Sequence, residues 1–437
     1  MILLHSPFRL ALLSGVLLSL AFPPLEWWWL GWFALAPLLL AVRMSTTSIQ
    51  ARICGFLTGL IAYPLILGWM WHVWWVLAIF AWWVLAVFLA LASGFLKRWE
   101  MNREISWWGW CLAAGCAWFV VEVFRAELWP LRFGMGSLGY SQVPSLEFRQ
   151  WVSWVGVYGL SLLMVVVNAG WALGWERFLQ RQRGWARPLA GSILGVVVLG
   201  FGGHRLGQVK ETGTLVVVAV VQDEKIDLSV HERLSREMTG SRSASVANGA
   251  TTAKGAPDFV VWPEYGVELT PSWRKEATDR MGRLAQELRT TLVAGCMTFV
   301  GINAKKKFEN HTLVFGPDGQ INGRYTKMHP VQFIEGLMIQ GTDATVIRTE
   351  KGVIGTPICY DMDYTDVVRK LSLNGAQLFL TPIMDPLIWG KVEHFQRLRI
   401  AQMRAVESRR WVGRATSSGI SAIIDPRAPI PHIADMI

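Results

Sequence analysis

Residues Ile53 to Leu96 read ICGFLTGLIAYPLILGWMWHVWWVLAIFAWWVLAVFLALASGFL and contain no aspartate, glutamate, lysine or arginine. A helix needs about 20 apolar residues to cross a bilayer, so this stretch is about twice as long as one crossing. We therefore expect two membrane-spanning helices, joined by a turn near Trp71-His72. This stretch assigns the first half of the chain to the membrane.

Further apolar segments flank this stretch on both sides. Together with the two helices above they predict seven spans, of which the first, second and last are short. The flanking segments are Leu10 to Phe22, Trp28 to Val42, Ile105 to Phe124, Val152 to Trp175 and Leu189 to Phe201. The basic residues before the first segment could belong to a signal peptide, but Ala21-Phe22-Pro23-Pro24 is a poor cleavage site, so we expect a retained span.

The composition supports a membrane protein. Of 437 residues, 52% are hydrophobic and 25 are tryptophan, which is too apolar for an ordinary soluble chain. The net charge of +10 could suggest nucleic acid, but many basic residues lie in short loops between apolar segments, where membrane topology explains them better. The cysteines form no metal-ligand spacing and imply no disulfide framework. They are Cys54, Cys111, Cys116, Cys296 and Cys359.

Loop charges predict the orientation of the spans. Basic residues concentrate in the loops on one side, which should be cytoplasmic. Those on this side are Arg9, Arg43, Arg52, Lys97, Arg98, Arg103, Arg177, Arg181, Arg183 and Arg187, against Arg125, Arg132 and Arg149 on the other. Seven crossings from a cytoplasmic N-terminus place everything after about Gly203 on the opposite side. In a double-membrane bacterium that side is the periplasm.

After about Thr214 the pattern changes to short strands that alternate with amphipathic helices, which predicts a layered α/β domain around a buried sheet. The expected strands are Leu215 to Val221, Phe259 to Trp262, Thr291 to Phe299, Thr312 to Phe315, Val353 to Ile358, Gln377 to Leu380 and Trp411 to Thr416. The expected helices are Ser272 to Arg289, Tyr364 to Leu373 and Val392 to Arg409. We predict domains at residues 1–205 and 213–430. Residues Thr239 to Gly255 have the composition of a mobile loop.

Three reactive side chains follow expected strands, and strand ends are where α/β domains build their sites. Glu264 follows Val260 to Pro263, and Lys327 ends a hairpin arm after Pro317-Asp318-Gly319. Cys359 directly follows a strand, and an expected helix begins within a few residues of it. A helix N-terminus and a nearby ammonium would both favour the thiolate. Each residue alone also fits an ordinary role: a solvated glutamate, a surface lysine and a buried core cysteine.

Taken in the order Glu, Lys, Cys, these segments resemble the nitrilase superfamily, whose site is such a triad. The resemblance extends into the apolar half, where several segments look like apolipoprotein N-acyltransferases. These segments are Glu122 with Arg125, Gly139 to Gln142 and Gly156 to Gly159. That family also shows a His, then Val, Phe and Glu at alternate positions after the lysine, here His329, Val331, Phe333 and Glu335. The similarity covers roughly Leu10 to Asp425 and implies a membrane bundle followed by a nitrilase-like αββα sandwich.

The chain departs from the family pattern in several places. Asp361 stands where the family usually has Glu, and Trp389-Gly390 lacks the Phe usually found between them. Pro330, Gln332 and Ile334 alter the loop after the lysine. The family normally ends with one more membrane helix, whereas this chain shows no apolar run of that length before Ile437. The substituted positions affect the expected acyl-chain or substrate preference more than the triad. For the missing helix two explanations stay open: a truncated sequence, or a domain anchored only from its N-terminal side.

By this resemblance Cys359 attacks the ester carbonyl of a phospholipid, Glu264 acts as general base and Lys327 stabilises the oxyanion, with the Tyr360 backbone N–H as a further donor. The resemblance assigns Glu335 to the support of Lys327. The resulting thioester would be attacked by the α-amine of a diacylglyceryl-cysteine at a lipoprotein N-terminus, without metal or cofactor. Candidates for shaping the lipid entrance are Asn310, Phe333 and Trp389, for which ordinary packing is an equal alternative.

Two other functions remain open at the level of the sequence. A membrane-tethered amidase could use the same triad to hydrolyse a small C–N substrate, although one span would suffice as a tether. A non-catalytic membrane scaffold with a degenerate nitrilase-like domain is disfavoured because all three triad residues are present. The sequence does not indicate the lipid headgroup, the acyl-chain length, the lipoprotein clients or the oligomeric state.

Overall fold

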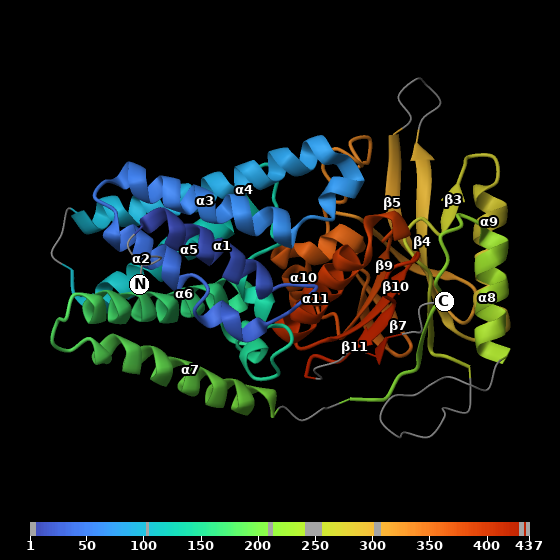
Figure 1. Ribbon diagram of the computed structural model, residues 1–437. Coiled ribbons are helices and arrows are strands. Elements are labelled where there is room, and N and C mark those ends of the chain that lie inside the picture. The colour runs from blue at the N-terminus through green and yellow to red at the C-terminus, as the bar shows by residue number, and fades with distance from the viewer. Residues whose placement is uncertain are drawn as a thin grey trace. The chain divides into compact units, whose positions relative to one another are not determined.

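The computed structural model describes residues 6–101, 105–208, 213–240, 256–300, 307–427 and 432–433. These residues form two compact units (Figure 1). The first unit comprises Met1–Val209 with Ile388–Arg399, and the second comprises Lys210–Leu387 with Ile400–Ile437. Most of the predicted mobile loop, Thr239 to Gly255, lies outside the described residues.

The first unit is helical. Its main helices are α1 (Pro7–Leu20), α2 (Ala36–Met44), α3 (Ser48–Ile66), α4 (Met70–Met101), α5 (Trp107–Val123), α6 (Val152–Leu179) and α7 (Ala186–Gly207). Short turns precede two of them: η2 (Trp28–Trp32) before α2, and η4 (Leu138–Gln142) and η5 (Phe148–Trp151) before α6. Each predicted span coincides with at least one of these helices.

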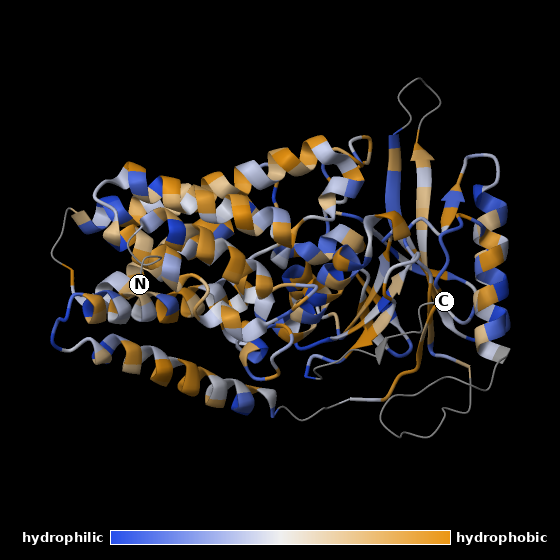
Figure 2. Cartoon of the chain, viewed as in Figure 1, coloured by the Kyte–Doolittle hydropathy of each residue, from blue (hydrophilic) through white to orange (hydrophobic). Residues whose placement is uncertain are grey.

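Hydrophobic residues, coloured orange in Figure 2, recur along the whole length of these helices. Four of the described helical segments are long and apolar enough to cross a membrane: Ser48–Ile66, Met70–Met101, Phe148–Leu179 and Ala186–Gly207. The segments Pro7–Leu20 and Trp28–Met44 are apolar but shorter. An apolar helical first half with helices long enough to span a membrane is therefore confirmed, whereas the total of seven crossings stays a prediction.

The turn predicted near Trp71-His72 is misplaced. Helix α3 ends at Ile66 and α4 begins at Met70, so the chain turns a few residues earlier. Pro64 and Gly68 explain the difference, because both residue types disfavour a continuing helix. A second break follows at Trp74, whose backbone angles are non-helical (φ −164°, ψ 100°).

Polar side chains inside the helical unit are paired with backbone groups. Glu122 accepts hydrogen bonds from the Leu138 backbone N–H and the Trp118 indole, each at 2.8 Å. The Arg125 guanidinium donates to the carbonyl oxygens of Phe133 and Met135. These contacts satisfy backbone groups of an irregular segment that would otherwise lack partners in an apolar environment.

The second unit contains two sheets. The first has the strand order β1 (Val218–Val220), β2 (Phe259–Val261), β4 (Thr291–Val300), β5 (Lys307–Phe315) and β6 (Ile321–Thr326), with β3 (Val267–Leu269) also paired to β4. The second has the order β12 (His432–Ile433), β11 (Ala422–Ile424), β10 (Trp411–Thr416), β9 (Leu378–Ile383), β8 (Gly352–Gly355) and β7 (Val346–Thr349). Both sheets mix parallel and antiparallel pairs.

The two sheets pack face to face between helices (Figure 1). Their shared core joins Phe259, Val261, Val293 and Val314 of the first sheet to Ile347, Ile354, Leu380 and Ala415 of the second. Helices α8 (Leu228–Gly240) and α9 (Arg274–Leu288) cover the outer face of the first sheet. Helix α10 (Thr365–Leu373) and the end of α11 (Lys391–Ser408) lie beside the second sheet. This arrangement confirms the predicted αββα sandwich.

The predicted elements agree with the structure in kind and differ mainly at their ends. The strand Trp411–Thr416 has the predicted bounds, whereas β5 begins at Lys307, five residues before the prediction. The first part of β5 was not predicted because its residues are charged or polar, and the apolar run begins only at the buried end of the strand. The sequence did not predict the short strands β3, β7 and β11 or helix α8.

Candidate active site

Glu264 lies just beyond the end of β2 and is 3% exposed. Its Oε1 accepts hydrogen bonds from Lys327 Nζ at 2.8 Å and Asn310 Nδ2 at 2.6 Å, and its Oε2 accepts one from the Met384 backbone N–H at 2.9 Å. Gly295 on β4 makes room for this turn, because a Cβ there would lie 2.2 Å from the Pro263 carbonyl oxygen. The carboxylate is therefore held by donors from two other strand ends and from β5.

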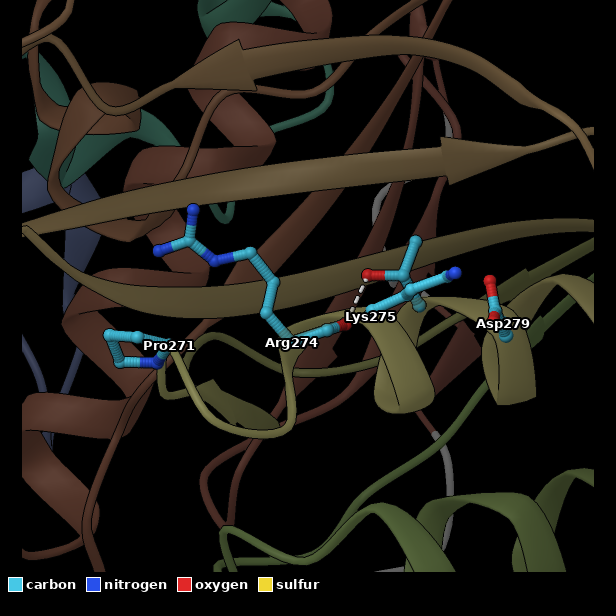
Figure 3. A pocket seen from close by; sticks show the side chains of 5 residues that line it. Pro271, Arg274, Lys275 and Asp279 are labelled. Atoms are coloured by element: carbon cyan, nitrogen blue, oxygen red, sulfur yellow. Dashed lines mark hydrogen bonds between the residues drawn. The ribbon is translucent and has the colours of Figure 1, made fainter.

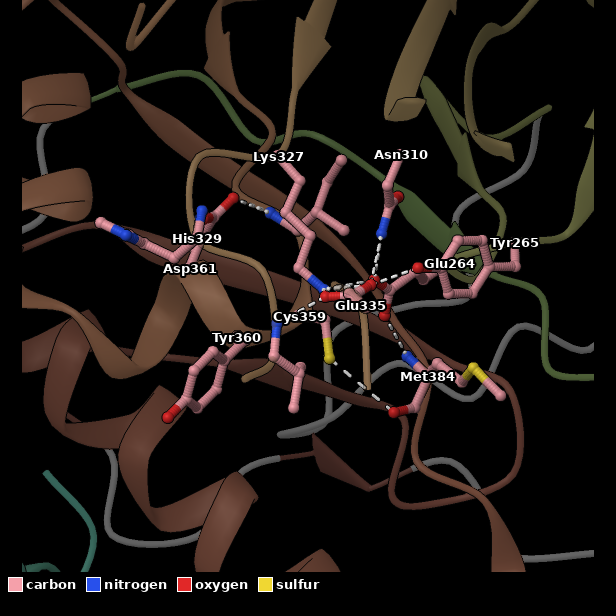
Figure 4. A network of polar contacts seen from close by, with 12 residues as sticks. Glu264, Tyr265, Asn310, Lys327, His329, Glu335, Cys359, Tyr360, Asp361 and Met384 are labelled. Carbon is pink, nitrogen blue, oxygen red and sulfur yellow. Dashed lines mark hydrogen bonds and ion pairs between the residues drawn. The ribbon is translucent and has the colours of Figure 1, made fainter. Parts of the chain in front are cut away.

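Lys327 follows β6 and is 1% exposed. Its ammonium lies between two carboxylates, at 2.8 Å from Glu264 Oε1 and at 3.0 and 2.8 Å from the two oxygens of Glu335 (Figure 4). Burial alone would lower the pKa of Lys327, but Glu264, Cys359 and Glu335 outweigh it and hold that pKa above its usual value. The buried ammonium is thus a fixed positive charge.

Glu335 is bound from several sides. Burial tends to raise its pKa, yet Lys327, Tyr265 and the Val331 backbone N–H lower the pKa overall. The Val331 N–H donates to Glu335 Oε2 at 2.7 Å. Asn310, predicted to shape the lipid entrance, is fully buried and donates to Glu335 Oε1 at 3.3 Å as well as to Glu264. Its position favours support of the two carboxylates.

Cys359 follows β8 and begins the short turn η6 (Cys359–Asp363). Its φ of +44° places it in the left-handed region, which costs a non-glycine residue about 1–3 kcal/mol and is often found at functional sites. Cys359 is 3% exposed, and its Sγ lies 3.7 Å from the Met384 carbonyl oxygen. Met384, just after β9, thus contacts both Glu264 and Cys359 through its backbone.

Asp361 connects the cysteine segment to the lysine segment. Its carboxylate accepts from the backbone N–H groups of Ile358 at 3.1 Å and His329 at 2.9 Å, and from the Tyr325 hydroxyl at 2.8 Å. Burial raises the pKa of Asp361 to about 6. Ile358 precedes the cysteine and His329 follows the lysine by two positions, so this one side chain ties the two segments together.

A second buried carboxylate fixes the segment that contains Met384. Asp385 forms an ion pair with Arg414 of β10, and both side chains are fully buried. The Asp385 backbone N–H donates to Ser417 Oγ at 3.2 Å, and its carbonyl accepts from Ser418 Oγ at 2.7 Å. Arg414 also donates to the Ile420 carbonyl at 2.8 Å. The chain around Met384 is therefore held at several points.

The remaining predicted site residues lie in different environments. Tyr360 is buried, and its hydroxyl lies 3.4 Å from Gln332 Oε1. Phe333 is 57% exposed with a φ of +67°, on the loop after Lys327. Trp389 ends the turn η7 (Leu387–Trp389) and belongs to the first compact unit. The substrate contacts of these residues stay predictions.

Sequence reasoning missed two members of the site. Met384 contributes backbone atoms alone, so its side-chain type carries no signal. Tyr265 donates a hydrogen bond to Glu335 Oε1, across seventy positions of the chain. Its place directly after Glu264 was the one available clue, and an aromatic residue there equally fits ordinary packing.

A surface pocket elsewhere in this unit contains no cysteine. It has a volume of about 440 Å³ and lies at the start of α9, lined by Pro271, Arg274, Lys275, Thr278 and Asp279 (Figure 3). Within the described ranges, His, Cys, Asp and Glu side chains form no group that could hold a metal ion. The polar network around Lys327 is the arrangement suited to covalent chemistry.

Two sequence-family profiles match the chain. The profile of the apolipoprotein N-acyltransferase N-terminal domain matches residues 14–170, and that of carbon-nitrogen hydrolases matches residues 217–431. The first therefore lies within the helical unit, and the second covers the two sheets.

Curated relatives match both halves at once. A Geobacter metallireducens protein named apolipoprotein N-acyltransferase is 30% identical, over 97% of this chain and 86% of the relative. A Nitrosomonas europaea protein of the same name is 24% identical, over 98% and 89%. Among solved structures, Nit3 of Saccharomyces cerevisiae, a nitrilase-superfamily member, is 20% identical with a TM-score of 0.40, over 52% of this chain and 89% of Nit3.

Proposed function

The chain belongs to the apolipoprotein N-acyltransferase family, and we propose that it moves a fatty acyl group from a membrane phospholipid to the α-amino group of an S-diacylglyceryl-cysteine at a lipoprotein N-terminus. It is a membrane enzyme that acts as an N-acyltransferase. The family predicted from the sequence is confirmed. The match to the Geobacter metallireducens relative across 97% of the chain carries this conclusion, because a tethered amidase would share the hydrolase half alone.

The proposed first half-reaction uses the buried network around Lys327. Glu264 takes the proton of the Cys359 thiol, and the sulfur attacks the carbonyl carbon of the phospholipid ester. Lys327, with the Tyr360 backbone N–H, stabilises the negative oxygen that forms. The ester C–O bond then breaks, Glu264 returns its proton to the leaving lysophospholipid oxygen, and a thioester remains on Cys359.

The second half-reaction repeats these roles with an amine. The neutral α-amine of the diacylglyceryl-cysteine attacks the thioester carbonyl, and Lys327 again faces the negative oxygen. Glu264 accepts the proton that the amine loses and passes it to the departing Cys359 sulfur. The products are an amide and the free thiol, so no cofactor or metal is required. A positioned base contributes about 10²–10⁴-fold to such a reaction.

We assign the substrate entrance to the exposed loop after Lys327 and to Trp389. Phe333, Ile334 and Leu337 are each more than half exposed, which suits contact with acyl chains. Asn310 is better placed to support Glu264 and Glu335, since it is fully buried and bonded to both.

The proposed location is the bacterial cytoplasmic membrane, with the catalytic domain on the periplasmic side. The ten-to-three excess of basic residues in alternate loops supports this orientation. We propose residues 1–205 as the membrane domain and residues 213–430 as the catalytic domain.

The direct test supplies both substrates to the purified full chain. Mixed bacterial phospholipid vesicles with a labelled acyl chain are incubated with a diacylglyceryl-cysteine peptide that has a free N-terminus. We expect a labelled amide on the peptide, and no product from a matched peptide whose N-terminus is already acetylated. Consumption of small amides without transfer to the peptide would instead support the amidase.

A further inference from the structure

Tyr265 directs its side chain into the same cluster as the residue before it. Successive residues of an extended chain point to opposite sides, yet Glu264 and Tyr265 both reach the Lys327 network (Figure 4). The φ of Tyr265, +57°, is the cause, because this left-handed conformation turns the chain back at the end of β2. A bulky residue beside the site thus keeps a backbone conformation that most residues with side chains avoid.

The Tyr265 hydroxyl is a donor to Glu335. It donates to Glu335 Oε1, the oxygen that also accepts from Lys327 Nζ at 3.0 Å and Asn310 Nδ2 at 3.3 Å. Burial, Glu264 and Glu335 raise the pKa of Tyr265 far above its usual value, so the phenol keeps its proton. Its ring packs edge-on against Phe308, with 6.3 Å between the centroids.

The charges of the network explain why such a donor is useful. Glu264 and Glu335 carry two negative charges against the single positive charge of Lys327, and all three side chains are at least 94% buried. Surplus negative charge inside a protein is unfavourable unless hydrogen-bond donors compensate it. When Glu264 takes the cysteine proton, the surplus negative charge moves to the sulfur and then to the substrate oxygen. Glu335 must stay ionised throughout, as the counterion that fixes Lys327.

We propose that Tyr265 is a positioning residue for acyl transfer: its hydroxyl keeps Glu335 ionised and oriented, so that Glu335 holds the Lys327 ammonium toward the oxyanion in both half-reactions. This inference rests on the proposed function. Asn310 and the Val331 N–H share the task, and Tyr265 differs from both in lying on the turn at the end of β2 that carries the general base. Loss of its hydroxyl should therefore affect the chemical step more than lipid binding.

The test is Tyr265→Phe, which removes one oxygen and keeps the ring against Phe308. The rate of thioester formation on Cys359 is measured with labelled phospholipid and no acceptor, at several lipid concentrations. We expect the limiting rate to fall by about 10- to 100-fold, the usual effect of one hydrogen bond to a charged group, with KM for lipid within about twofold. The thermal unfolding midpoint is recorded for each variant.

A matched control and a double variant separate positioning from packing. Tyr158→Phe removes the same atom from a Tyr–Glu hydrogen bond of 2.8 Å in the helical unit and should leave the rate within about twofold of wild type. In a Glu335→Gln background, Tyr265→Phe should change the rate by less than about threefold, because its effect acts through the Glu335 carboxylate.

Provided that the wild-type enzyme forms the thioester, three outcomes would overturn the inference. They are an unchanged rate in Tyr265→Phe, a fall explained by a higher KM, and an equally large fall in the Glu335→Gln background. Absence of the thioester in wild type would instead overturn the proposed function.

Discussion

Removal of the Asp385 carboxylate should damage both the stability and the activity of the enzyme. Asp385→Asn leaves the Arg414 guanidinium fully buried without its charge partner. Loss of one member of a buried ion pair typically costs about 3–5 kcal/mol in the free energy of unfolding. For a domain of this size, 1 kcal/mol shifts the melting temperature by about 2–4 °C, so the expected decrease is about 6–20 °C.

The effect on activity follows from the neighbouring residue. The Met384 backbone N–H donates to Glu264 Oε2 at 2.9 Å and its carbonyl oxygen lies 3.7 Å from Cys359 Sγ, so a shift of this segment moves the proposed base relative to the proposed nucleophile. A displacement of about 1 Å can lower a rate about 10²-fold. We therefore expect the folded fraction of Asp385→Asn to transfer acyl groups about two orders of magnitude more slowly.

The assay combines thermal unfolding in detergent with acyl transfer at a temperature where the variant remains folded. Asp425→Asn is the matched control, because Asp425 pairs at 3.1 Å with Arg427, whose side chain is 29% exposed, in the same unit. Because water reaches this pair, its loss should cost less than that of the fully buried pair; fully exposed pairs contribute about 0–1 kcal/mol. Equal melting temperatures and equal rates in the two variants would refute the argument that the buried pair holds the Met384 segment.

Three further predictions concern topology, roles and pH. A reporter fused after Gly203 should be extracytoplasmic, and activity of a cytoplasm-only reporter there would show that the count of crossings is wrong by one. Glu264→Gln should fold normally and transfer acyl groups at least about 10²-fold more slowly; a rate near wild type would exclude Glu264 as the base. Because burial raises the pKa of Asp361 to about 6, above 3.8, proton uptake near pH 6 favours the folded state. Protonation also weakens the hydrogen bonds by which the Asp361 carboxylate ties the Cys359 segment to the Lys327 segment. Activity should therefore fall below pH 6 without a matching loss of melting temperature. Asp361→Asn, compared over pH 5–8, should lack this pH-dependent step.

The triad was predictable because its signals are local. Glu264, Lys327 and Cys359 each follow a strand that an apolar run reveals, and the strands of an α/β domain bring such ends together. The structure joins Glu264 to Lys327 and connects Glu264 to Cys359 through the Met384 backbone. Alternating strands and helices predicted the α/β class of the second half, and the resemblance carried by the three residues at strand ends predicted its sandwich fold.

The supporting contacts were not predictable because they depend on tertiary structure. The Asp385–Arg414 pair joins a residue that follows β9 to a residue inside β10, and each residue alone fits a surface charge. The side chain of Tyr265 reaches the site because of its positive φ, and glycine is the one residue type whose presence in a sequence indicates such an angle. The turn after α3 was misplaced because the apolar pattern continues through it, and only Pro64 and Gly68 mark the break.

The central claim is that Cys359 carries an acyl group between two substrates, and the most direct measurement is the mass of the peptide that contains it. Full-length enzyme given phospholipid vesicles and no acceptor should accumulate a fatty-acyl thioester, because the second step lacks its amine. Hydroxylamine or a diacylglyceryl-cysteine peptide should discharge this adduct. Cys359→Ala should show no adduct, whereas Cys296→Ala, altering a thiol buried in β4, should still form it. Absence of any fatty-acyl mass on Cys359, while small amides are consumed, would contradict the account.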